Sequence, residues 1–130
     1  MTLNDPLANT LSAMENAEKV GKKSCVVAPH ARIIAQVLSL LQEHEYIKGF
    51  EAGKNGRSTF VRVQLSGMIN KCGAIKPRYP VHKAGYERYE KRYLPAKDMG
   101  IIIVSTSQGM MVHSQAKQKA VGGRLIAYCY

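Results

Sequence analysis

The sequence predicts an α+β fold, with an N-terminal α-β-α-β-β domain over residues 1–67 packed on a C-terminal, mainly β domain with short helices over residues 68–130. Two amphipathic helical patterns before residue 45 indicate the first domain. Two apolar runs after residue 100 indicate buried strands in the second. Between them, residues 66–74 carry two glycines and mixed polarity, which is typical of a boundary.

Two helices and a short strand are expected first. Asn4-Asp5-Pro6 puts a capping side chain before a proline, and Gly21 suits the left-handed cap at the other end of this helix. After a strand over residues 24–28, Pro29 predicts the start of a second helix. The apolar positions at helical spacing are Leu7, Leu11, Met14 and Ala17, then Ile33, Ile34, Val37, Leu38 and Leu41.

A β-hairpin completes the first domain. Residues 46–52 and 58–65 predict two strands, and Asn55-Gly56 between them suits a type I′ turn. Lys54 and Arg57 flank this turn. Both are candidates for contact with a polyanion.

The second domain begins with an irregular segment. Residues 75–82 favour a short strand that Pro77 and Pro80 would confine to a sheet edge. A short helix over residues 85–93 would carry tyrosines 86, 89 and 93 on one face. We favour core packing for Tyr89 and leave Tyr86 open between packing and base stacking.

Residues 100–109 read GIIIVSTSQG, an apolar branched run followed by hydroxyl side chains. We expect the strand to stop where Ser105, Thr106 and Ser107 begin, because this Ser/Thr/Gln/Gly cluster favours a turn. Ser114 should then cap a helix through Val121. Gly122-Gly123 should end that helix and lead into a central strand over residues 124–130.

The net charge of +10 is uneven. Residues 1–65 carry 8 Lys/Arg against 6 Asp/Glu, and residues 66–130 carry 11 against 3, so the two halves are +2 and +8. A single-sign field of this size favours a polyanionic partner, nucleic acid above all. No stretch has the length of a membrane span or the pattern of an amphipathic membrane helix.

Targeting and metal signals are not evident. The first 18 residues contain no Lys or Arg, so we expect a cytosolic protein without a leader segment. Cys25, Cys72 and Cys129 lie far apart without zinc-site spacing, and we expect free, buried thiols. The four histidines show no metal-ligand spacing, so no metal or cofactor is expected.

The hydroxyl cluster permits three interpretations. Serine and threonine hydroxyls can bond base edges, 2′-hydroxyls and phosphates of RNA. Gly109, Gly122 and Gly123 would let backbone amides approach phosphates, with Lys117 and Lys119 alongside. An ordinary turn explains the same residues.

A small serine hydrolase is the third interpretation. The motif approaches the G-x-S-x-G elbow, which requires glycine in place of Ser105. A serine nucleophile also needs a histidine held by a carboxylate, and the second half has only three acidic residues. We therefore expect no enzyme, and keep this hydrolase and a generic single-strand-binding module as alternatives.

Four stretches carry a resemblance over nearly the whole chain: DPLANTLSAMENAEKVGKK, the second helix with EHEYIKGFE, GIIIVSTSQGMM with SQAK, and VGGRLIAYCY. The chain resembles the universal family of small-subunit ribosomal protein number eight, in its archaeal and eukaryotic form. The resemblance implies a two-domain protein of the cytoplasmic ribosome that binds an irregular helix in the central domain of small-subunit ribosomal RNA early in assembly. Its implied partners are neighbouring ribosomal proteins and, as in some bacterial relatives, its own messenger RNA, and we expect a monomer when free.

The resemblance also implies the contacts. Ser105, Thr106, Ser107 and Gly109 would meet the core of the RNA site, with Gly122 and Gly123 nearby. Basic residues of the first domain would touch the RNA backbone further along, and Lys54 and Arg57 are the candidates. Arg78 and Tyr86, in a region that departs from the shorter bacterial pattern, complete the candidate RNA-contacting residues together with Lys117 and Lys119.

Overall fold

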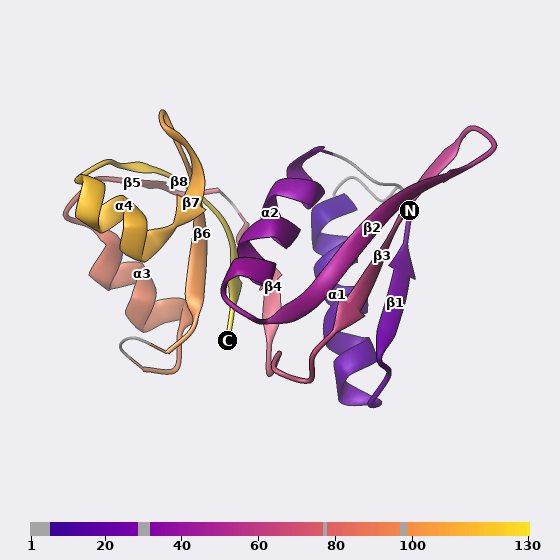
Figure 1. Cartoon of the computed structure of the whole chain (residues 1–130). Helices are drawn as coiled ribbons and strands as arrows, with labels where there is room; N and C mark the ends of the chain where they lie inside the picture. Colours follow the sequence, from indigo (N-terminus) through magenta and orange to yellow (C-terminus); the bar gives the residue numbers. More distant parts are fainter. Residues whose placement is uncertain (1–5, 29–31, 77, 97–98) are drawn as a thin grey trace. The chain divides into compact units, whose positions relative to one another are not determined.

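The computed structural model describes residues 6–28, 32–76, 78–96 and 99–130. Its helices and antiparallel sheets confirm the α+β class. The chain divides into two compact units, residues 1–72 and 73–130, drawn from indigo to pink and from pink to yellow in Figure 1. The domain boundary expected from the sequence, between residues 67 and 68, stays a prediction.

Unit 1 has the predicted α-β-α-β-β order. Its elements are α1 (Pro6–Lys19), β1 (Ser24–Val27), α2 (Arg32–Glu43), β2 (Ile47–Asn55) and β3 (Ser58–Leu65). The three strands form an antiparallel sheet in the order β1-β3-β2. Figure 1 shows both helices against this sheet, and their apolar faces form its core.

The helical predictions hold where the structure describes them. All four apolar residues predicted for α1 are buried, and Gly21 has the expected left-handed backbone, with φ of +76°. In α2 Leu40 is buried, while Ile33 is only half-buried. The predicted cap at Asn4-Asp5 and the predicted helix start at Pro29 lie outside the described residues.

The predicted type I′ turn is wrong. Asn55 pairs with Ser58 in the ladder, so Gly56 and Arg57 are the central residues of the turn. A type I′ turn requires positive φ at both central residues, and here only Gly56 has it, at +66°. Glycine at the first central position with an ordinary φ at the second fits a type II′ turn, which suits the same strand twist.

Unit 2 is mainly β. Its elements are β4 (Cys72–Ala74), β5 (Pro80–Val81), α3 (Tyr86–Tyr93), β6 (Ile101–Thr106), β7 (Gly109–Val112), α4 (His113–Lys119) and β8 (Gly123–Cys129). The strand order is β4-β8-β6-β7, and β5 also pairs with β8. The central position predicted for the last strand is confirmed. Side chains of α3, α4 and the sheet, among them Tyr86, Ile102, Val104 and Leu125, form one apolar core.

The strand expected over residues 75–82 is only partly present. It is reduced to β5, where Pro80 lies on a strand that pairs with β8 alone. That position tolerates a residue without an amide hydrogen. Pro77 lies outside the described residues.

Three predicted element ends in unit 2 are wrong. The strand β6 continues through Ser105 and Thr106 because Thr106 pairs with both Gly109 and Gly123. α4 begins at His113 with Val112 as N-cap and no capping side chain, so Ser114 is already inside the helix. α4 ends on Ala120, which itself takes the left-handed conformation, with φ of 54°.

Candidate nucleic-acid interface

Three chain segments end side by side at one edge of the unit 2 sheet. Thr106 pairs with Gly109 across the β6–β7 turn and with Gly123 at the start of β8, and Gly123 pairs with Val81 of β5. The next row of the ladder is Met110, Ser105, Arg124 and Pro80. We call residues 80–83, 105–109 and 122–124 the hydroxyl edge.

The three hydroxyls of this edge are not equivalent. Thr106 Oγ1 donates to the Gly109 carbonyl at 2.7 Å and accepts from the Gln108 amide at 3.1 Å. These two bonds close the turn around Ser107 and Gln108. Ser105 and Ser107 are exposed, so their hydroxyls face the surface from the strand and from the turn.

The glycines serve two structural purposes. Gly109 has φ of +110° with open space where a side chain would extend, so its backbone conformation requires glycine. A Cβ on Gly122 would lie 2.5 Å from the Val81 carbonyl oxygen, and one on Gly123 would overlap the Ser105 carbonyl oxygen. The predicted close approach of backbones at Gly122-Gly123 is therefore present, between strands of the protein itself.

Arg124 and His82 of the hydroxyl edge were not predicted from the sequence to contact RNA. Arg124 is exposed and lies directly opposite Ser105 in the β6–β8 ladder. His82 and Lys83 are also exposed, and their backbone lies beside Gly122. The signal for Arg124 was its position after the glycine pair. No local signal marks His82 and Lys83, because only strand pairing brings them to this edge.

The two lysines of α4 differ in their surroundings. Lys117 Nζ forms an ion pair with Glu90 Oε1 of α3, and the Glu90 side chain is 10% exposed. His113 Nε2 lies 3.4 Å from the same oxygen. Lys119 is exposed in the last turn of α4. Lys117 thus joins α4 to α3, whereas Lys119 points its charge to the surface.

The remaining candidates lie elsewhere. Lys54 and Arg57 are exposed at the tip of the β2–β3 hairpin, which extends beyond the rest of unit 1 in Figure 1. Arg78 is exposed just before β5. Tyr86 is 1% exposed, and its hydroxyl donates to the Val121 carbonyl at 2.8 Å. Its ring is a packing element of the core and offers no face for base stacking.

His113, the histidine in the helix after β7, is not placed to activate these serines. The backbone amide of Ile102 donates to His113 Nδ1 at 3.1 Å, and the other ring nitrogen faces Glu90. Both nitrogens of this histidine, which is 7% exposed, are therefore directed at groups other than a serine. Among the described residues, no group of three or more His, Cys, Asp and Glu side chains could hold a metal ion.

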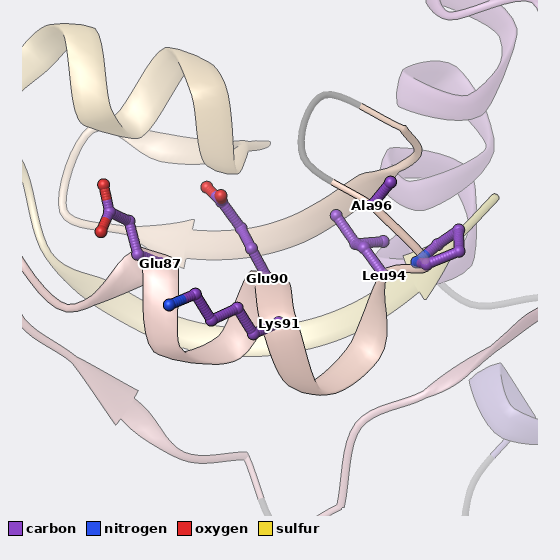
Figure 2. A pocket seen from close by; sticks show the side chains of 6 residues that line it. Glu87, Glu90, Lys91, Leu94 and Ala96 are labelled. Carbon is purple, nitrogen blue, oxygen red and sulfur yellow. The ribbon is translucent and has the colours of Figure 1, made fainter.

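The three cysteines are free, and Cys25 is only half-buried, contrary to the expectation of three buried thiols. Figure 2 shows a pocket of about 300 Å³ beside α3, where the carboxylates of Glu87 and Glu90 extend to the same side. In the described part of the chain, no helix has the length and apolar character needed to cross a membrane.

Comparison with protein families agrees with a nucleic-acid interface. Residues 5–130, nearly the whole chain, match the family model described as Ribosomal protein S8. Proteins of this family are structural components of the small ribosomal subunit that bind ribosomal RNA and contact other ribosomal proteins. An exposed edge of hydroxyls, glycines and cations in a basic unit is consistent with that function. The chain therefore belongs to the ribosomal protein S8 family.

Proposed function

We propose that the hydroxyl edge binds an irregular helix in the central domain of small-subunit ribosomal RNA and thereby supports assembly of the subunit. The observation that carries the proposal is the adjacency of exposed Ser105 and Arg124, next to the exposed turn at Ser107. Unit 2 has 10 Lys/Arg against 3 Asp/Glu, a net charge of +7, so a polyanion is attracted to it as a whole.

Different residues in and around the hydroxyl edge contact different parts of the RNA. Ser105 and Ser107 hydrogen-bond base edges or 2′-hydroxyls, since a hydroxyl both donates and accepts. Arg124 of the edge contacts phosphates together with Lys119 and Arg78, which lie outside the edge, and these contacts supply salt-dependent affinity. Gly109, Gly122 and Gly123 carry no side chains, so the RNA can approach the backbone of the edge closely. Thr106 shapes the turn through its two internal hydrogen bonds.

Lys54 and Arg57 touch the RNA backbone further along the helix. Lys117 acts through Glu90, by holding α4 in place. The free protein is a monomer in the cytoplasm, without enzymatic activity. The same edge would recognise a site in its own messenger RNA if that site reproduces the ribosomal one.

The test is a binding titration with a fragment of the central-domain helix, at several salt concentrations. The double variant Ser105→Ala/Ser107→Ala should lose about 1–3 kcal/mol of binding free energy, the loss expected for two hydrogen bonds. Its control is Ser12→Ala/Ser39→Ala, which removes two exposed serines from α1 and α2. Equal affinities of the two double variants would contradict the assignment. Protection mapping on small subunits would then show which RNA segment the protein covers.

A further inference from the structure

Five tyrosines and one arginine of unit 2 form a continuous row on α3, on β8 with the residue that follows it, and on the segment before β5. The ring of Tyr79 lies 5.9 Å from that of Tyr89, and Tyr93 stacks on Tyr128 at 5.5 Å between ring centroids. Tyr130 follows Tyr128 at 6.5 Å. All five rings are partly buried and pack against the apolar core of unit 2, which confirms the packing role predicted for Tyr89. We call these residues and Arg92 the tyrosine–arginine row.

Arg92 joins the two parts of the row. Its guanidinium carbon lies 5.4 Å from the ring centre of Tyr79 and 5.6 Å from that of Tyr93. The residue is exposed, and the ion pairs found among the described residues do not include it. Two aromatic rings therefore restrict its rotamers before any partner binds, which lowers the entropy cost of using it for binding.

The two flanks of α3 have opposite chemistry. Glu87, Glu90, Lys91 and Leu94 line the pocket of Figure 2 on one flank, and Glu90 is paired with α4. Arg88 and Arg92, one helical turn apart, share the other flank with the tyrosines. Acidic residues are thus directed to the α4 side, and the tyrosine–arginine row is bordered by positive charge.

We propose that the tyrosine–arginine row is a second RNA contact, which takes unpaired nucleotides. Bases of single-stranded RNA stack on aromatic rings and on the plane of an arginine, and neighbouring cations attract the phosphates between them. A basic protein tail fits the rings but is repelled by Arg88 and Arg92. An acidic peptide fits the charge but leaves the rings unused. The inference rests on the proposed RNA function, and it extends that function to a surface remote in sequence from Ser105 and Ser107.

The test uses the full chain and a short oligouridine with one central 5-iodouridine. The chain contains no tryptophan, so tyrosine fluorescence reports binding directly, and cross-linking followed by mass spectrometry locates the base. Arg92→Gln and Arg92→Lys should both weaken binding by roughly five- to tenfold, as expected when stacking on one base is lost. Arg88→Gln, which removes the same charge one turn away, should have a smaller effect. Cross-links should map to Tyr79 or Tyr93.

Several results would overturn the proposal: wild-type affinity in Arg92→Lys, equal losses in Arg92→Gln and Arg88→Gln, cross-links only at residues 105–109, or binding of oligoglutamate instead of oligouridine. Thermal melting shows whether each variant is folded. The Ser12→Ala/Ser39→Ala control should bind oligouridine as the wild type does. A variant that loses only the ribosomal RNA contact points to the hydroxyl edge, and a variant that loses only oligouridine binding points to the tyrosine–arginine row.

Discussion

Adjacent residues of one motif have different chemical roles here. Ser105 faces the surface from a strand and Ser107 from a turn, whereas the hydroxyl of Thr106 bonds to two backbone groups of that turn. From the sequence alone, all three are expected to contact RNA because each carries a hydroxyl. The ladder pair between Thr106 and Gly109 determines which of them is used internally. The sequence motif thus indicates which chemical groups are present at the site, whereas strand pairing determines which of these groups are accessible at the surface.

Replacing Thr106 by valine should reduce stability before it affects RNA binding. Valine keeps the branched shape but removes the hydroxyl, so the bonds to Gly109 and Gln108 are lost. We expect the free energy of unfolding in urea to fall by about 0.5–1.5 kcal/mol. Thr106→Ser, which retains the hydroxyl, is the control and should keep most of the free energy of unfolding that the valine variant loses. A valine variant as stable as the wild type would show that the turn does not depend on these bonds.

Cys72 should make the protein sensitive to alkali. Burial, with a smaller contribution from Glu15, raises the pKa of its thiol from 9.0 to about 12. Above pH 9 the unfolded thiol loses its proton while the folded one keeps it. The free energy of unfolding therefore falls as pH rises from 9 to 12, by at most about 1.4 kcal/mol per pH unit from this group.

Urea denaturation between pH 8 and pH 11 checks this expectation. Cys72→Ala should lose stability less steeply than the wild type over that interval, because one raised pKa is removed. Cys25→Ala is the comparison, since burial also raises the pKa of that thiol but the residue is only half-buried. If the wild type and Cys72→Ala fell in parallel, the Cys72 thiol would not contribute.

At the scale of elements, α4 is tied to α3 by charge. Lys117 pairs with Glu90, which is 9% exposed, so removing the lysine leaves a buried carboxylate that keeps His113 beside it but has lost its ammonium partner. Lys117→Gln should lower the free energy of unfolding and change the salt dependence of RNA binding little. Lys119→Gln should leave stability unchanged and flatten the slope of log affinity against log salt by up to about one unit.

A double variant tests whether the stability effect of Lys117 comes from its pairing with Glu90. Glu90→Gln/Lys117→Gln should be more stable than Lys117→Gln alone, because the unpaired charge is gone. The measurements are urea denaturation and RNA titrations at several salt concentrations. If Lys117→Gln flattened the slope of log affinity against log salt as much as Lys119→Gln does, both lysines would contact phosphates.

The interiors of helices and strands were predictable, and several of their ends were not. Periodicity gave α1, α2 and β3 because the apolar face of each element is repeated along its own sequence. The end of β6 depends on Gly109 and Gly123, which are not its neighbours in the chain. Likewise, α4 ends on Ala120 although glycines follow, since Gly122 and Gly123 are required where strands approach closely.

The same distinction applies to the site. Ser105, Ser107 and the glycines were found because they form a local motif, whereas Arg124 and Lys83 are brought beside them by pairing of β5, β6 and β8. Tyr86 illustrates the reverse case. Its spacing allowed either packing or stacking, and only the core around it shows that the ring is buried.

At the scale of the whole molecule, charge opposes folding in the absence of a partner. The net charge is +10, with +3 on residues 1–72 and +7 on residues 73–130. Like charges on a compact chain repel, and salt screens them within a Debye length of about 10 Å at 0.1 M. A polyanion that binds only the folded protein stabilises it further by mass action.

The melting temperature should therefore rise when NaCl is added at low ionic strength, and rise more when the central-domain RNA helix is added at the same ionic strength. Lys54→Gln/Arg57→Gln removes two exposed charges at the β2–β3 tip and should melt with a smaller salt dependence than the wild type. Calorimetry across a salt series provides the measurement. A melting temperature independent of salt would mean that the charges are already compensated within the fold, and the basic surface would then lose its role as the main attraction for RNA.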